Sequence, residues 1–218
     1  MKVLALSDFH GFLPSFYRVV EKADEIEADL IVVAGDITHF GDLEDAKKLL
    51  GILTQSGSDV LFVPGNCDPP SLASVDWNKP RCLHGRNVSV EDLCFLGVGG
   101  ALKGPFHTLF EVDDGEIKSI LEACLRSEPS RRFVVVSHNP PKNTKLDLTR
   151  LGLHVGSMSL RSFIEQHKPL CVVCGHIHEA RGVDSLGLTV LVNPGPARDG
   201  NYAVLELDDK VKVEFGKL

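Results

Sequence analysis

Three short apolar segments near the start of the chain are separated by two stretches with helical periodicity. The apolar segments are VLALSD (3–8), DLIVVAGD (29–36) and DVLFVPGN (59–66). Between them, PSFYRVVEKADEI (14–26) and LEDAKKLLGIL (43–53) repeat apolar residues at helical spacing. This order predicts a βαβαβ unit, with parallel strands in a sheet that is covered on both faces. Ligands of such sheets bind beyond the carboxyl ends of the strands.

The middle of the chain is less regular. NVSVEDLCFLGVGG (87–100) predicts two short strands that meet at Glu91 and Asp92, and a helix is expected over 114–126. RRFVVVSH (131–138) predicts another buried strand, and a long polar loop follows at 139–157. Loops of this length are uncommon in compact domains and are often functional.

The last third adds a helix near 158–167, a strand LCVVCGH (170–176) and an antiparallel end. After LTVLVNPGP (188–196), the segment NYAVLELDDKVKVEFGKL (201–218) alternates apolar and polar residues around a turn at Asp208, which is typical of a hairpin. Without an internal repeat or a linker, the chain is expected to form one domain over 1–218.

The composition is that of an ordinary globular protein, with 43% hydrophobic residues, 24% charged residues and a mean hydropathy of +0.04. A net charge of −7 argues against bulk binding to nucleic acid or anionic lipid, because such binding needs clustered Lys and Arg. No apolar stretch approaches the ~20 residues that span a bilayer, and the N-terminus lacks a signal-peptide core. We therefore expect a cytoplasmic protein with no membrane partner; the oligomeric state stays open.

Polar side chains follow five of the predicted buried strands. Taken singly, each has an ordinary explanation, since Gly-Asp and Gly-Asn pairs are common in turns and a strand-end His is often solvated. Their joint occurrence is harder to explain by turn preferences, because parallel strands bring such ends to one edge. These side chains are Asp8, His10, Asp36, Asn66, His138, His176 and His178.

Carboxylate, imidazole and amide groups in this number indicate a metal site. A single four-coordinate zinc ion needs fewer ligands than these seven. Two ions that share a carboxylate would use them all, and paired ions ~3.5–4 Å apart form the clamp that catalyses in-line displacement at phosphorus or carbonyl centres. Imidazole and oxygen ligands together suit Mn, Ni, Fe, Co or Zn, of which we favour manganese.

Six short motifs in order along the chain resemble those of the calcineurin-like metallophosphoesterases. They are SDFHG (7–11), GDITHFG (35–41), GNCD (65–68), SHNPP (137–141), CGHIH (174–178) and NPGPA (193–197). The Gly-Asn-Cys-Asp motif is similar to that of a subset of small proteins in the family. This subset contains phosphodiesterases and relatives of a retromer scaffold subunit. The resemblance implies a four-layer αββα sandwich of mixed sheets, with the antiparallel C-terminal hairpin.

The resemblance also implies a dinuclear centre. One metal would be held by Asp8, His10 and His178, the other by Asn66, His138 and His176, and Asp36 would bridge the two. A metal-bridging hydroxide would then attack phosphorus in a small phosphoester, more plausibly a diester than a monoester. The alternative is a protein-binding scaffold that keeps the fold and a vestigial metal site.

Cys67 occupies the position where the family commonly has a histidine near the scissile ester. Its thiol could donate a proton, but it cannot offer positive charge to a phosphate oxygen, which favours good leaving groups such as aryl or cyclic diesters. A covalent nucleophile at Cys67 would need a base that the metal site already uses. His39 is a substitute acid, with His107 and His154 as weaker candidates, and Asp68 is expected to orient the turn or its neighbour.

Two other patterns imitate known sites. Cys171 and Cys174 form a C-x-x-C, but three-residue spacing in a strand sends the side chains to opposite faces, so buried packing is expected. GVGGALKGP (97–105) lacks the features of a P-loop or a dinucleotide fingerprint and is expected to be a flexible loop that rims the site. In NPGPA, Pro196 removes a hydroxyl and an N–H that a substrate could contact.

Overall fold

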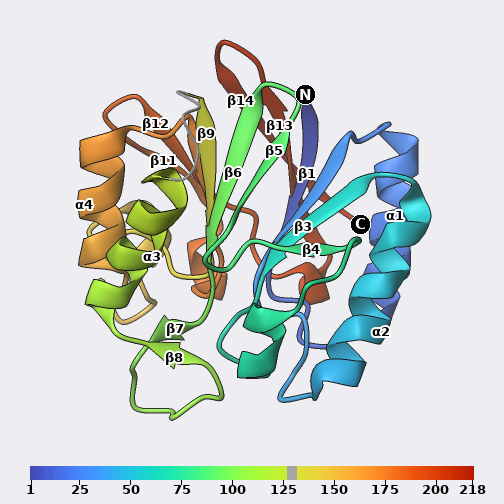
Figure 1. Ribbon diagram of the computed structural model, residues 1–218, viewed down its shortest axis with the longest axis horizontal. Coiled ribbons are helices and arrows are strands. Elements are labelled where there is room, and N and C mark those ends of the chain that lie inside the picture. The colour runs from blue at the N-terminus through green and yellow to red at the C-terminus, as the bar shows by residue number, and fades with distance from the viewer. Residues whose placement is uncertain (127–131) are drawn as a thin grey trace.

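Four layers make up the computed structural model, which describes residues 1–126 and 132–218. Two six-stranded sheets pack face to face, and two helices cover the outer face of each sheet (Figure 1). The αββα sandwich of mixed sheets predicted from the sequence is therefore confirmed.

The first sheet has the order β14-β13-β1-β2-β3-β4. Strands β1 to β4 are parallel, and the β13–β14 hairpin pairs with β1 in the antiparallel direction. Its strands are β1 (Lys2–Leu6), β2 (Leu30–Ala34), β3 (Asp59–Val63), β4 (Arg81–Cys82), β13 (Asn201–Leu207) and β14 (Val211–Lys217).

The second sheet has the order β11-β12-β10-β9-β6-β5, in which the four central strands are parallel and both edge strands are antiparallel. Its strands are β5 (Asn87–Val90), β6 (Leu93–Val98), β9 (Phe133–Ser137), β10 (Cys171–Val173), β11 (Gly182–Leu186) and β12 (Thr189–Asn193). A separate small parallel pair joins β7 (Ala101–Leu102) to β8 (Glu111–Val112).

Helices α1 (Leu13–Glu25) and α2 (Leu43–Leu53) pack on the first sheet, and α3 (Asp114–Arg126) and α4 (Met158–His167) pack on the second. Their starts have clear local causes. A capping box between Asp42 and Asp45 begins α2, and the Ser157 hydroxyl accepts from the backbone N–H of Leu160 at the start of α4. Short 3₁₀ turns occupy Thr54–Ser56, Pro70–Ser74, Lys145–Asp147, His178–Ala180 and Ala197–Asp199.

The buried strands are apolar on both faces because successive side chains pack alternately into two different cores. In β1, Val3 and Ala5 face the core between the sheets, whereas Leu4 and Leu6 face the helices. Cys171 and Cys174 divide in the same way, since Cys171 belongs to the inter-sheet core and Cys174 to the core under α3 and α4. All six cysteines are buried, which confirms the packing role expected for this C-x-x-C pair.

Several elements differ from the sequence-based expectation. Helices cover only one face of the first sheet, because the second sheet covers the other. LTVLVNPGP was expected to begin the antiparallel end, but β12 pairs with β10 in the parallel direction and is antiparallel only to β11. Strands β4, β7, β8 and β11 were not predicted, since they are short or lack an apolar pattern. Arg131, where the strand before His138 was expected to begin, lies outside the described residues.

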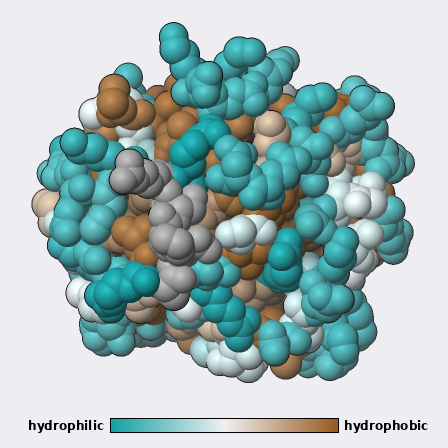
Figure 2. Space-filling view, turned by 45° about the horizontal axis from the view of Figure 1, so that its top comes forward, coloured by the Kyte–Doolittle hydropathy of each residue, from teal (hydrophilic) through white to brown (hydrophobic). Residues whose placement is uncertain are grey.

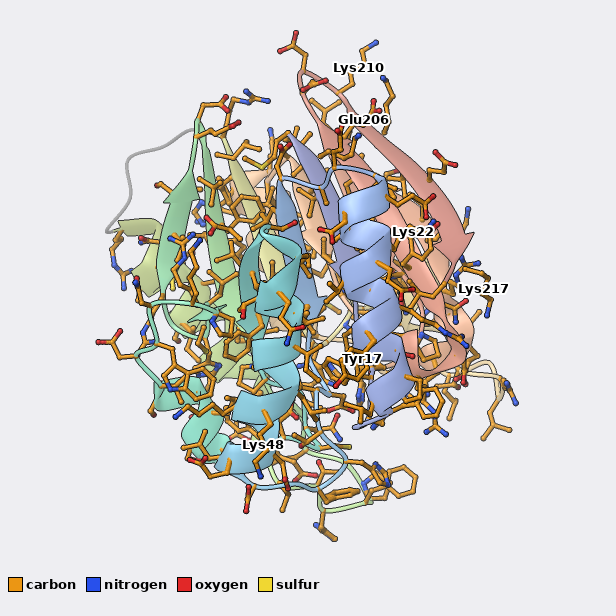
Figure 3. The ribbon with its side chains drawn as sticks, turned by 90° about the vertical axis from the view of Figure 1, so that its right-hand side faces the viewer. Tyr17, Lys22, Lys48, Glu206, Lys210 and Lys217 are labelled. Carbon is orange, nitrogen blue, oxygen red and sulfur yellow. The ribbon has the colours of Figure 1, made fainter. Side chains whose placement is uncertain are left out.

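One end of the sandwich has a largely hydrophilic surface. Figure 2 shows the end at which β1 begins, where hydrophilic residues form most of the surface. Figure 3 shows α1 and α2 in front of the first sheet, with Tyr17 and Lys48 on these helices and Lys210 at the tip of the β13–β14 hairpin. The loops that follow the parallel strands lie at the opposite end from this tip. Within the described residues, no helix is both long enough and apolar enough to cross a membrane.

Candidate metal centre

The strand-end side chains singled out in the sequence come from both sheets. Asp8, Asp36 and Asn66 follow β1, β2 and β3 of the first sheet, whereas His138 and His176 follow β9 and β10 of the second. Sequence analysis placed them along one edge. The packing of the sheets instead brings two edges together, and β2 and β9 are in contact across the sandwich.

Asp8, His10 and His178 form the first group of converging ligand atoms. The Nε2 atoms of His10 and His178 lie 3.1 Å apart, and His178 Nε2 lies 3.4 Å from Asp8 Oδ1. Burial raises the pKa of Asp8, but the hydrogen bond with His178 and the other interactions with neighbouring imidazoles outweigh it, so that the net shift is downward. The hydrogen bond to Asp8 raises the pKa of His178, whereas burial lowers that of His10. His10 Nδ1 is buried and has no hydrogen-bond partner among the described residues.

His138 and Asn66 form a second cluster with Asp36. His138 Nδ1 lies 2.8 Å from the carbonyl oxygen of Ala34, so this nitrogen carries the proton in the neutral imidazole. The lone pair on His138 Nε2 then faces Asn66 Oδ1 at 2.9 Å and Asp36 Oδ1 at 3.6 Å. Three acceptor atoms that converge without a proton between them suit a cation.

Asp36 lies between the two clusters. Its Oδ2 is 3.6 Å from His10 Nε2 and its Oδ1 is 3.6 Å from His138 Nε2. The backbone N–H of Cys67 also donates to Oδ1, at 2.8 Å. The carboxylate therefore offers one oxygen to each cluster and is held by the turn after β3.

His176 lies beside the second cluster and is half-buried. Its ring centre is 5.0 Å from that of His138, and its backbone N–H donates to the Asp8 carboxylate at 3.2 Å. Burial and the neighbouring His138 lower the pKa of His176 to about 4. The imidazole is therefore neutral at physiological pH, which is the form that binds metals.

Four of these residues have a left-handed backbone conformation. The φ angles are 56° at Asp8, 47° at His10, 53° at Asp36 and 68° at His176. Such conformations cost of order 1 kcal/mol each outside glycine and cluster at functional sites. Hydrogen bonds between the loops after β1 and β2 hold them, including Asp8 N–H to Gly35 O at 2.9 Å and His10 N–H to Asp36 O at 2.8 Å.

The glycines of the G-D, G-N and G-H motifs make room for side chains from other strands. A Cβ on Gly35 would lie 2.3 Å from His138 Nδ1, and one on Gly65 would lie 2.1 Å from Asp36 Oδ1. At Gly175 it would lie 2.7 Å from Asp8 Oδ2. Sequence analysis noted only that Gly-Asp and Gly-Asn pairs are common in turns, whereas the close approach of a carboxylate or imidazole requires glycine at all three positions.

Asp68 is fully buried behind this cluster. Its carboxylate accepts from the backbone N–H groups of Gly65 at 2.8 Å, Ile37 at 3.1 Å and Thr38 at 2.7 Å, and from the Thr38 hydroxyl at 2.9 Å. It thereby ties the loop after β2 to the loop after β3. The orienting role of Asp68 stays a prediction, which these contacts support.

Cys67 and His39 meet His10 in a third group of candidate ligand atoms. Cys67 is buried, and the amide of Asn66 donates to its sulfur at 3.5 Å. Burial, followed by the charges of Asp36, Asp68 and Asp8, raises the pKa of the Cys67 thiol. His39 is exposed, and its ring centre lies 5.4 Å from that of His10. Cys67 and His39, the two candidate proton donors, therefore both lie beside His10.

The two weaker histidine candidates lie in loops. His154 Nδ1 is 2.7 Å from Asp147 Oδ1, and the buried Asp147 also accepts from three backbone N–H groups of the loop after β9. This loop was expected to be polar and functional, and its fold is organised around Asp147. His107 is exposed between β7 and β8.

A cavity of about 510 Å³ adjoins the centre at Asn66 and His176. Its walls come from the segment around β7 and β8 and from the loop after β9, and include Leu102, Phe106 and Val155. The glycine-rich segment at 97–105 was expected to be a flexible loop that rims the site. Its residues 97–98 instead end β6 and its residues 101–102 form β7, and residues 101–105 line this cavity. Sequence patterns gave no signal for Phe106 or Val155, because a single apolar loop residue has no periodicity.

Known proteins resemble the chain over most of its length. The family model for calcineurin-like phosphoesterases matches residues 1–180. An uncharacterized protein of Methanocaldococcus jannaschii is 38% identical over 203 residues, which cover 90% of this chain and 88% of that protein. A probable cyclic nucleotide phosphodiesterase of Vesicomyosocius okutanii is 24% identical, covering 91% of this chain and 80% of that protein. The crystal structure of TT1561 of Thermus thermophilus superposes with a TM-score of 0.81 at 22% identity, covering 99% and 98% of the two chains.

Proposed function

Since the chain belongs to the calcineurin-like phosphoesterase family, we propose that it is a phosphodiesterase whose strand-end side chains hold two divalent cations. The observation that carries this proposal is the convergence of acceptor atoms around Asp36, whose two oxygens face different imidazoles. Asp8, His10 and His178 would hold one cation, Asn66, His138 and His176 the other, and Asp36 both. Manganese is the favoured ion among Mn, Ni, Fe, Co and Zn.

The residues of the centre fit this use. One cation would satisfy the lone pair of His138 Nε2 and the facing Asn66 oxygen, and the other would satisfy the facing imidazole nitrogens of His10 and His178. Divalent cations supply Lewis-acid stabilisation of the charge at phosphorus and an activated water at neutral pH. The chain itself orients the ligands, through Ala34 for His138 and through Cys67 N–H for Asp36. Asp68 acts as a positioning residue that fixes the two loops.

Two features support a diester over a monoester. Cys67 is neutral where an imidazolium could meet the second charge of a monoester, and Lys103, a lysine of the cavity lining, is paired with Asp113 at 2.8 Å. The cavity beside the centre also has room for a second ester group. The related protein of Vesicomyosocius okutanii is named as a probable cyclic nucleotide phosphodiesterase. We therefore propose small phosphodiesters as substrates.

The leaving group needs a proton unless it is already a good one. Cys67 and His39 are the two candidate donors, and both stand beside His10. Cys67 is buried and close to the bridging carboxylate, whereas His39 is exposed to incoming substrate.

A metal-reconstitution assay tests the function. The chelated protein should be inactive, and Mn²⁺ should restore turnover of bis-aryl diesters by at least about 10³-fold, because the nucleophile and the charge stabilisation both depend on the metal. Ni, Co, Fe and Zn are compared, with aryl monoesters and 2′,3′-cyclic nucleotides as alternative substrates. Faster turnover of monoesters would refute the diester preference. Absence of turnover with every metal would favour the scaffold alternative.

Replacing Cys67 with histidine tests whether this position limits protonation of the leaving group. We expect Cys67→His to raise kcat/KM for alkyl esters relative to aryl esters by at least about tenfold, because a general acid helps most when the leaving group is poor. The measurement is the ratio of the two rates in the same preparation. An unchanged ratio would remove Cys67 from the leaving-group step. His39→Gln in the same series should slow alkyl esters selectively if His39 is the donor.

A further inference from the structure

We infer that the cavity beside the centre binds a hydrocarbon group of the substrate, so that the preferred substrates are phosphodiesters with one alkyl or unsubstituted aryl ester. This inference rests on the proposed function and specifies its substrate class. It follows from where the cavity lies, what lines it, and how its polar groups are already engaged.

The cavity is placed to receive one ester group of a bound phosphodiester. Asn66 and His176, both proposed to hold the same cation, form part of its lining. The segment between β7 and β8 is fixed to this point, because the backbone N–H of Phe110 donates to the carbonyl oxygen of Asn66 at 3.1 Å. A phosphodiester held at the centre would therefore have the cavity within reach of one of its ester groups.

Apolar side chains form most of the remaining wall. Ala101, Leu102, Pro105 and Phe106 come from the β7 side, and Val155 faces them from the loop after β9. A cavity of about 510 Å³ is large enough for a group of ring or short-chain size, within the ~300–1,000 Å³ usual for ligand sites.

Several polar side chains of the lining already have partners. Glu111 accepts from the backbone N–H of Thr108 at 3.0 Å and from its hydroxyl at 3.2 Å. The Thr149 hydroxyl donates to the carbonyl oxygen of Leu153 at 3.2 Å, and Lys103 is paired with Asp113. A nucleobase or sugar would find part of this hydrogen-bonding capacity already in use, and each of its polar groups that became buried without a partner would cost about 1–3 kcal/mol. A hydrocarbon group has no such cost.

Exposed apolar side chains gather around this end of the molecule. Phe12, Phe40, Phe106, Leu109, Leu151 and Leu153 are all exposed, and each lies in a loop beyond the carboxyl end of a strand. Phe106 is 86% exposed, in the loop that projects beyond β7 and β8 (Figure 1). The end at which β1 begins is mostly hydrophilic (Figure 2). These loops therefore present apolar surface where an apolar substrate would enter.

A homologous series of inhibitors tests the inference. O-alkyl methylphosphonates carry the single charge of a diester, and their alkyl chain can be lengthened from methyl to hexyl without changing the phosphonate. On the Mn²⁺-loaded protein, calorimetry and inhibition of bis-aryl diester turnover should show affinity rising by about fourfold per methylene until the cavity is filled.

Two valines provide a matched pair of variants. Val155 lines the cavity and is 39% exposed, whereas Val183 lies on β11, outside the cavity lining, and is 45% exposed. We expect Val155→Ser to weaken binding of the hexyl ester by about tenfold while leaving the methyl ester unchanged, and Val183→Ser to change neither. Equal effects of the two substitutions, or tighter binding of a nucleoside ester than of the hexyl ester, would overturn the assignment.

The outcome also separates this inference from the proposed function. Turnover of diesters without any dependence of affinity on chain length would refute the hydrocarbon site and leave the phosphodiesterase in place. Affinity that rises with chain length in a protein that hydrolyses no diester would refute the phosphodiesterase and support the hydrocarbon site.

Discussion

Replacing Asp36 with asparagine should lower kcat on aryl diesters by about 10³-fold or more, the loss usual for removal of a central electrostatic group. Asp36 is the carboxylate that faces both clusters, with its two oxygens each 3.6 Å from a different imidazole nitrogen. Asparagine keeps an oxygen that can accept from Cys67 N–H, but it removes the negative charge that two cations would share. Both metals should therefore bind more weakly, and kcat should fall with metal content.

Metal content and thermal stability distinguish this loss from misfolding. The metal-free variant should unfold at a temperature no lower than the metal-free parent, because removing one charge from a site that also holds Asp8 and Asp68 relieves repulsion. The rise in Tm that Mn²⁺ gives to the parent should be largely absent. Asp209→Asn, an exposed position in the β13–β14 turn, is the matched control and should behave as the parent does. Retained activity in Asp36→Asn would contradict the bridging role.

Gly65→Ala should greatly reduce activity, although Gly65 is not one of the proposed metal ligands. The Cβ of alanine would lie 2.1 Å from Asp36 Oδ1 and 2.2 Å from the backbone nitrogen of Asp36. Because backbone atoms cannot swing away as a side chain can, either the turn after β3 or the loop after β2 must shift. We expect activity to fall by about 10²-fold, as for a displacement of about 1 Å in a catalytic site, and the free energy of unfolding to fall by about 2 kcal/mol.

Gly51 in α2 is the control for this substitution. A Cβ there meets nothing within 4 Å, and the residue has helical backbone. Gly51→Ala should therefore stabilise the protein by about 0.5–1 kcal/mol and leave kcat unchanged. Urea unfolding and steady-state kinetics on both variants make the comparison. If Gly65→Ala matched Gly51→Ala in both measurements, the close packing around Asp36 would have no functional importance.

Helix boundaries were well predicted because they depend on local signals. The helix expected over 43–53 begins and ends at Leu43 and Leu53, with the Asp42 capping box supplying the start signal. The helices at 114–126 and 158–167 were equally well placed. Strand β11 (Gly182–Leu186) was missed because its sequence, GVDSL, has little apolar character and its pairing depends on β12.

The composition of the candidate site also followed from the sequence, but its geometry did not. Asp8, Asp36 and His138 could be singled out because each follows an apolar strand, and the strands fix the spacing along the chain. That Asp36 lies between two imidazoles, and that Asp68 ties two loops together, depends on contacts between segments that are about 30 or more residues apart.

By itself, the sequence determined the order of the four helices and of the longer apolar strands, the identity of the polar residues at the strand ends, and the family to which the chain belongs. These depend on periodicity and local motifs, which a linear pattern records. The tertiary structure decided that the strand ends come from two sheets, that Gly65 makes room for Asp36, and that Phe106 and Val155 enclose a cavity beside Asn66 and His176. These features arise from the packing of distant segments, whose shape complementarity no local pattern encodes.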